Sequence, residues 1–223
     1  PDGEERGVTD AVSAELFDPS TGVFEAIANP PGGGRAFHSA TLIGTGTVLV
    51  AGGRYFNDDL GSEDVSGKAV LFSGAKYLES LTDDSVNPWG SMITMGDGGQ
   101  LARAHHGAIA VPGENRVVLA GGVARTANGS AFPDLGLEVV GIGTALPTVV
   151  TFDLDSDGSG GVWSEALDHL DRPRAGAQLA IQEHSSGPRV VVIGGYDSAG
   201  AVAAIEVISN LTGVSGSIEV APF

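Results

Sequence analysis

The sequence predicts an all-β repeat protein built from four-stranded units, and three observations support this. Three glycine pairs each end a β-branched apolar run, and each follows an Arg-Ala pair at nearly the same distance along the chain. The arginines of these pairs are themselves almost evenly spaced. The chain of 223 residues has 35 Gly and 11 Pro, is 17% charged, and has no obvious helical region. The repeated residues are Arg35, Gly52 and Gly53; Arg103, Gly121 and Gly122; and Arg174, Gly194 and Gly195.

Each unit begins with a predicted β-hairpin. In the first unit, two apolar strands at 35–43 and 47–53 flank a turn that contains two glycines. The pattern recurs at 103–122 and at 174–195, with a different turn each time. His38 and His106 occupy the same repeat position, where the third unit has Ala177.

A polar loop and a second pair of strands follow each glycine pair. Third strands are predicted at 69–72, 148–153 and 204–208, and fourth strands around 89–95, 161–167 and 217–220. The long segments 54–68 and 123–147 are interpreted as insertions. They are the candidate binding loops, because binding residues concentrate in loops on a rigid scaffold.

The beginning of the chain contains half a unit. Residues 13–24 predict a third and a fourth strand joined by the turn Asp18-Pro-Ser-Thr-Gly22. We therefore expect about fourteen strands. The expected organisation is a polar segment at 1–11, a half-unit at 12–30, a first unit at 31–98, a second at 99–170 and a third at 171–223.

These residues resemble kelch repeats of the bacterial type. The resemblance lies in Arg-x-x-His, the strand that ends in Gly-Gly, and Glu15-x-Phe-Asp-Pro-x-Thr-Gly22. It implies a β-propeller in which each unit is one blade, and a ring of six or seven blades of which this chain supplies about three and a half. Further blades from the same precursor or a partner chain would complete the ring, because an open array leaves strand edges exposed. Typical kelch units have about 50 residues, so these carry insertions.

The repeated residues are interpreted as structural. A glycine pair permits close backbone approach and a positive φ where blades crowd around an axis. The arginines are expected to pair with carboxylates or carbonyls between blades. Because His38 and His106 recur at one repeat position, they too are expected to be structural, and adjacent His105 and His106 should point to opposite faces of a strand rather than hold one ion.

The charge and the composition exclude several partners. A formal net charge of −17 repels nucleic acid and anionic membranes. No apolar stretch is long enough to span a bilayer, and the absence of cysteine excludes disulfides and thiol chemistry. The first residues lack signal-peptide features and an initiator Met, which suggests a processed chain or a fragment with any targeting segment upstream. The repeat style favours an extracellular, cell-surface or periplasmic location in a bacterium.

Two acidic clusters are candidate sites. Asp153, Asp155 and Asp157 form a D-x-D-x-D-G pattern whose alternating carboxylates could hold Ca²⁺, although position 12 of the loop is Ser164 rather than Glu. The alternative is a solvated acidic hairpin. The second cluster lies in the insertion at 54–68 and could bind a cation or a basic partner, or simply be solvated. Its members are Asn57, Asp58, Asp59, Glu63 and Asp64.

The sequence favours a binding protein over an enzyme. No serine-nucleophile motif is present, and the galactose-oxidase-like enzymes among kelch propellers need a cysteine that this chain lacks. We expect a non-catalytic module of an exported bacterial protein that binds a protein or a glycan, with no cofactor other than calcium. Two alternatives remain: a structural subunit of a surface assembly or filament, and part of an enzyme whose active site lies at the propeller axis.

Overall fold

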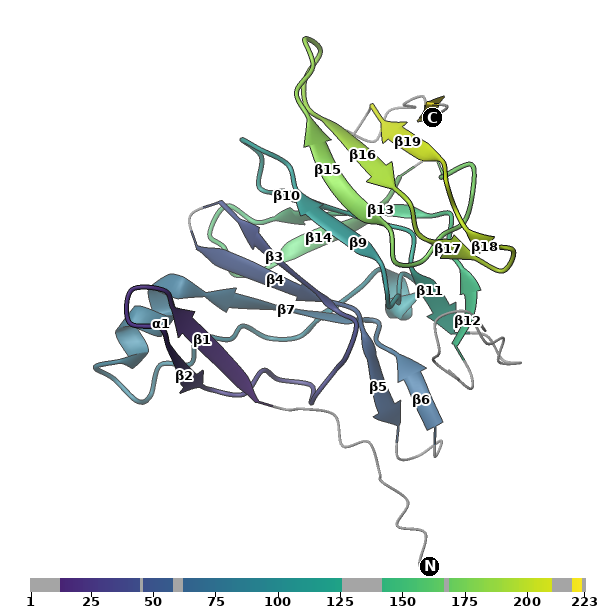
Figure 1. The fold of residues 1–223 in the computed structure, drawn as a ribbon. Helices are drawn as coiled ribbons and strands as arrows, with labels where there is room; N and C mark the ends of the chain where they lie inside the picture. The colour runs from purple at the N-terminus through teal and green to yellow at the C-terminus, as the bar shows by residue number, and fades with distance from the viewer. Residues whose placement is uncertain are drawn as a thin grey trace, which may run out of the picture.

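The chain is all-β, as predicted. The computed structural model describes residues 13–44, 46–57, 62–125, 142–166, 169–209 and 218–221. Within them, three four-stranded antiparallel sheets and several two-stranded sheets follow one another along the chain (Figure 1). These sheets do not close into a ring within the described part of the chain. Neither helix found in the same ranges is long and apolar enough to cross a membrane.

The four-stranded sheets are meanders in which consecutive hairpins pair in sequence order, as the repeats predict. The first consists of β3 (Ser39–Ile43), β4 (Thr47–Ala51), β7 (Lys68–Ser73) and β8 (Ile93–Thr94). The second consists of β9 (Gly107–Ala110), β10 (Arg116–Ala120), β13 (Val149–Leu154) and β14 (Gly161–Glu165). The third consists of β15 (Gln178–Gln182), β16 (Arg189–Ile193), β19 (Ile205–Ile208) and β20 (Ile218–Ala221). The half-unit is a hairpin of β1 (Ala14–Asp18) and β2 (Val23–Ile27).

The segment after each glycine pair forms an additional hairpin, where the sequence predicted only a loop. In each unit the residue after the repeated arginine pairs with the first residue of this hairpin, as Ala104 does with Val123. The three hairpins extend from the same end of their sheets (Figure 1), and β12 contacts both β6 and β17. They are β5 (Arg54–Asn57) with β6 (Ser62–Val65), β11 (Val123–Arg125) with β12 (Ile142–Ala145), and β17 (Tyr196–Asp197) with β18 (Gly200–Ala201).

A short helix that the sequence did not predict, α1 (Gly74–Ser80), lies between β7 and β8. The Ser73 hydroxyl caps it by accepting a hydrogen bond from the Lys76 N–H. A 3₁₀ turn, η1 (Asp97–Gly99), follows β8. The fourth strand of this unit is consequently shorter than expected: β8 has two residues, and an isolated bridge between Phe72 and Trp89 precedes it.

The core lies between neighbouring sheets, because alternate side chains of each second strand point to opposite neighbours. Leu49 of β4 packs with Val117 and Leu119 of β10 in one cluster. On the other face of β10, Val118 packs with Val190 of β16 in a second cluster. Each inner strand is thus apolar on both faces, which explains the continuous apolar runs before the glycine pairs.

The glycine pairs hold neighbouring units together. The Gly53 N–H donates to the Arg103 carbonyl over 2.9 Å, and the Gly122 N–H donates to the Arg174 carbonyl over 2.8 Å. The first glycine of each pair has a positive φ, 63° at Gly52 and 66° at Gly121. A Cβ at Gly52 would lie 2.2 Å from the Arg103 carbonyl oxygen, so a side chain cannot fit there.

Candidate functional site

The side chains of the repeated arginines bind within their own unit, although contacts between units were predicted from the sequence. Arg103 is 1% exposed and donates to the carbonyls of Leu101, Gly121 and Thr148 and to the Thr148 hydroxyl. Burial lowers the pKa of Arg103 to about 10, so it stays charged at neutral pH. Arg174 is also buried, and it donates to the Glu206 carboxylate. Both guanidinium groups therefore tie the second strand to the third strand of one sheet.

Arg35 differs from its two counterparts. Its Nη1 donates to the carbonyls of Gly52 and Lys68, at 3.4 and 3.1 Å, as the counterparts do in their units. Position 148 supplies a threonine hydroxyl to Nη2 of Arg103, but the matching residue of the first unit is Lys68, whose side chain cannot accept a hydrogen bond. Among the described residues, Nη2 of Arg35 has no acceptor. Its donors are available to a ligand.

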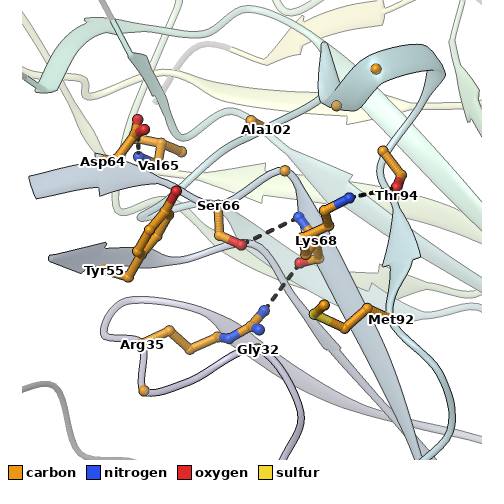
Figure 2. Close-up of a pocket in the computed structure, with 14 residues that line it drawn as sticks. Gly32, Arg35, Tyr55, Asp64, Val65, Ser66, Lys68, Met92, Thr94 and Ala102 are labelled. Carbon is orange, nitrogen blue, oxygen red and sulfur yellow. Dashed lines mark hydrogen bonds between the residues drawn. The ribbon is translucent and has the colours of Figure 1, made fainter. Parts of the chain in front are cut away.

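Arg35 lines a pocket of about 460 Å³ in the first unit. Figure 2 shows the Arg35 guanidinium and the Lys68 side chain in this pocket, with Tyr55 and Asp64 of the β5–β6 hairpin along one side. The opposite side comes from the segment around β8, which contributes Thr94 and two glycines of the following turn. The wall is tightly packed, because a Cβ at Gly32 would lie 2.5 Å from the Met92 sulfur.

Two cations, Arg35 and Lys68, and one carboxylate, Asp64, line the pocket of this strongly acidic protein. The Lys68 Nζ donates to the Thr94 hydroxyl over 2.8 Å, and Lys68 is exposed, so its remaining donors face solvent. The Ser66 hydroxyl accepts from the Lys68 backbone N–H over 3.2 Å, which fixes the start of β7. Burial lowers the pKa of Arg35, but its ordinary value is high enough that it remains a cation. Two cations beside hydroxyl groups suit an anionic, hydroxyl-bearing ligand.

Two of the three aspartates of the predicted calcium motif have separate side-chain partners. Asp153 is the next-to-last residue of β13 and accepts from Nε of Arg116 on the adjacent strand, over 2.6 Å. Asp157 accepts from the backbone N–H and the hydroxyl of Ser159, and these bonds lower the pKa of Asp157. Nowhere in the described ranges do three or more His, Cys, Asp or Glu side chains gather in a metal-binding arrangement. Calcium at this turn stays a prediction.

The other acidic cluster is divided by the hairpin. Asn57 ends β5 and Glu63 lies in β6, whereas Asp58 and Asp59 lie outside the described residues. Asp64 is buried, lines the pocket, and accepts from the Val65 N–H over 2.8 Å. Of this acidic cluster, Asp64 is the member that lines the candidate pocket, and Tyr55, Ser66 and Lys68 of the predicted binding loop 54–68 line it as well.

The repeated histidine of the second unit contacts the first unit, whereas His38 contacts the Arg35 carbonyl of its own unit. His106 Nε2 lies 2.8 Å from the Ser39 hydroxyl of the first unit. The adjacent His105 instead stacks on Phe37, with ring centroids 4.0 Å apart, so the two histidines face different groups. They do so just before β9 rather than within a strand, because His105 has a φ of 54°. Burial, together with nearby Arg103, lowers the pKa of His106 to about 3.

The Ser39 and His106 pair lacks the features of a catalytic triad. His106 Nδ1 is buried and has no hydrogen-bond partner in the described part of the chain, so no carboxylate orients the ring. A pKa near 3 also makes the imidazole a poor general base at neutral pH. The pair is best explained as a polar contact between two units.

Several pocket residues were not singled out from the sequence. Tyr55, Ser66 and Lys68 lie in the predicted binding loop 54–68 but were not named as site residues, and Thr94 lies in a separate segment. One signal was available for Lys68, because it is one of only eleven basic residues in an acidic chain and replaces the threonine or alanine of the other units. Arg35 was predicted, but as a structural residue.

Comparison with known proteins supports the fold alone. No family model matches the chain, and no curated protein matches it. Among solved structures, 130 chains match, including one described as "Structure of YjhT" with a TM-score of 0.59 and 15% sequence identity. That match covers 95% of this chain and 52% of the other, so this chain spans about half the length of that structure.

Proposed function

We propose that this chain is part of a kelch-type β-propeller that acts as a non-catalytic binding module of an exported bacterial protein. In this proposal the four-stranded sheets are blades, about three and a half of a ring of six or seven. The repeated contacts between units support it, since each glycine pair meets the arginine carbonyl of the next unit in the same way. The three additional hairpins at one end of the sheets provide a surface for a partner.

The observation that carries the binding function is the unused Nη2 of Arg35 beside Lys68 in the pocket. A pocket of about 460 Å³ suits one or two saccharide rings better than a protein surface. The Tyr55 ring offers an apolar face, and Ser66 and Thr94 offer hydroxyl partners. We therefore favour a glycan that carries a carboxylate over a neutral glycan or a protein.

The two alternatives have less support. A structural subunit would need large contacts along the sheet edges and no ligand in the pocket. An enzyme would need titratable groups that converge at one end of the axis. Among the described residues, the pair that most resembles such a group is Ser39 and His106, and no carboxylate contacts the His106 ring.

The test is binding of an acidic oligosaccharide, such as an oligomer of a uronic acid, compared with its neutral counterpart. The variant Lys68→Thr removes one cation and restores the hydroxyl acceptor found at position 148, so we expect binding of the acidic glycan to weaken at least tenfold. Lys76→Thr makes the same charge change on exposed α1, outside the pocket, and serves as the matched control. Equal binding of acidic and neutral glycans, or equal effects of both variants, would contradict the proposal.

A further inference from the structure

Strand β1 has an unpaired edge. Each third strand of the complete units, β7, β13 or β19, pairs with a second strand on one side and a fourth strand on the other. Strand β1 matches them in sequence, because Phe17-Asp18 corresponds to Phe152-Asp153 near the end of β13. Among the described residues β1 pairs with β2 alone. In the described part of the chain, no second strand lies against the other edge of β1.

The first unit also has an uncovered face. Residues two and four places before the first glycine of each pair point toward the preceding unit. In the second unit these are Val117 and Leu119, both 0% exposed beneath the first sheet. In the first unit they are Val48 and Val50, which are only partly buried and pack beside the half-unit.

The open edge and the uncovered face border one groove of about 410 Å³. Ala14 and Leu16 of β1 form one wall, and Val48, Val50 and Phe72 form the other, with Trp89 nearby. The Trp89 indole N–H donates to the Ala28 carbonyl over 2.5 Å, which ties the half-unit to the first unit. Arg35 and His38 lie along the groove as well.

The two complete interfaces show what covers such a face. The first unit covers the second with the hairpin β3–β4, and the second covers the third with β9–β10. Backbone bonds accompany this packing: the His105 N–H donates to the Phe37 carbonyl over 3.1 Å, and the Gly176 N–H donates to the His105 carbonyl over 2.7 Å. The corresponding Phe37 N–H has no backbone partner among the described residues. The carbonyls of Arg103 and Arg174 accept hydrogen bonds from glycine pairs. Among the described residues, the Arg35 carbonyl is contacted only by the His38 ring.

We infer that this groove seats a β-hairpin of the first-and-second-strand type, with a Gly-Gly end, supplied by polypeptide other than residues 1–223. Its second strand pairs antiparallel with β1, which is strand addition to an exposed edge. Its apolar side chains cover Val48 and Val50, and its second glycine donates an N–H to the Arg35 carbonyl. The inference follows from the repeat geometry and does not depend on the glycan proposed above.

A second copy of the chain does not satisfy this arrangement. Each Gly-Gly hairpin in the chain already pairs with its own third strand, through β4 with β7, β10 with β13 and β16 with β19. A second copy could add to β1 only by giving up one of these pairings. The groove therefore requires a hairpin that lacks a third strand of its own.

The test is a fusion that supplies such a hairpin. A copy of the segment 35–53 is placed directly ahead of Pro1, so that the segment 1–13 connects the added Gly-Gly to β1. This connection is nearly as long as the segment 54–67, which connects Gly53 to β7 in the first unit. We expect the melting temperature to rise by about 5 °C or more. Amide hydrogen exchange in β1 should slow at least tenfold, because its open edge becomes paired.

The control is the same fusion with Ala-Ala in place of the added Gly-Gly. At the matching position in the chain, a Cβ on Gly52 would lie 2.2 Å from a carbonyl oxygen, so the Ala-Ala hairpin should not seat. In the Gly-Gly fusion, Leu16→Lys should abolish the rise, whereas Phe17→Lys, on the exposed opposite face of β1, should preserve it. No rise over the Ala-Ala fusion, or unchanged exchange in β1, would overturn the inference.

Two other occupants have distinct signatures. If wild-type chain forms a dimer in sedimentation that Leu16→Lys dissociates, the occupant is a second copy and the inference is wrong. If deletion of residues 1–12 from the unfused chain lowers the melting temperature and accelerates exchange in β1, that segment is the occupant, which also overturns the inference. The expected result is a monomer whose stability the deletion leaves unchanged.

Discussion

Two glycines with the same backbone conformation should respond very differently to alanine. Gly121 and Gly194 both have a φ of 66° and both begin a glycine pair. A Cβ at Gly121 would lie 2.3 Å from the Arg174 carbonyl oxygen of the next unit. At Gly194, a Cβ meets no atom of the described residues within 4 Å. The pair therefore separates the cost of the backbone conformation from the cost of the contact between units.

The magnitudes follow from these contacts. Alanine at a positive φ costs about 1–2 kcal/mol, and this is the whole effect expected for Gly194→Ala. Gly121→Ala adds about 1–3 kcal/mol for overpacking against a backbone that cannot move away. It also weakens the Gly122 hydrogen bond to the Arg174 carbonyl, worth about 1 kcal/mol. We expect a total of about 3–6 kcal/mol for Gly121→Ala.

The assay is urea unfolding of both variants, with the wild-type chain and Gly22→Ala as references. Gly22 lies in the turn between β1 and β2, has a φ of 72°, and is equally open among the described residues. Gly194→Ala should match Gly22→Ala, and Gly121→Ala should unfold at a clearly lower urea concentration with the same m-value. Equal destabilisation by Gly121→Ala and Gly194→Ala would refute the role assigned to the contact between units.

Three further predictions concern buried charge, pH and calcium. Glu206→Gln should destabilise the chain by about 3 kcal/mol in thermal or urea unfolding, because the buried carboxylate pairs with Arg174 and accepts the Asp171 N–H over 2.7 Å; an effect below about 1 kcal/mol would contradict this. The His106 pKa is about 3 in the folded chain and 6.5 in the unfolded chain, so falling pH protonates the unfolded chain first. Stability should therefore fall between about pH 6.5 and pH 3, by about 1 kcal/mol per unit, and urea titrations should show a shallower fall for His106→Gln than for wild type. If Ca²⁺ binds at 153–158, it should raise the melting temperature of wild type but not of Asp155→Asn, and an equal response of both chains would exclude that site.

The repeat architecture could be predicted because its signals are local and recur. A glycine pair after an apolar run marks the end of a strand wherever it occurs, and three occurrences define the unit. The additional hairpins could not be predicted in the same way. Strands β17 and β18 have two residues each, too few to show an alternating pattern. Their pairing depends on the residue after the repeated arginine, which lies in another segment of the unit.

The candidate site was harder to predict than the fold, for a physical reason. The D-x-D-x-D-G pattern suggested convergence, but Asp153 sits directly opposite Arg116 in the strand register and pairs with it. A motif read along one strand cannot show what the adjacent strand supplies. The binding loop 54–68 was predicted, but its residues Tyr55 and Lys68 were not singled out for the same reason, since they meet Thr94 only when the hairpin and the sheet are assembled.

The repeated arginine can be compared between units, because it lies in similar surroundings in each unit but has different hydrogen-bond acceptors. In the second unit the Thr148 hydroxyl accepts from the repeated arginine, and in the third unit the Glu206 carboxylate does so. The first unit has neither acceptor near Arg35, and Lys68 at the position of Thr148 brings a second cation instead. The repeated arginine is thus structural in the second and third units, whereas in the first unit Arg35 has spare donors beside a pocket. Departure from the repeat, rather than the repeat itself, is what points to binding.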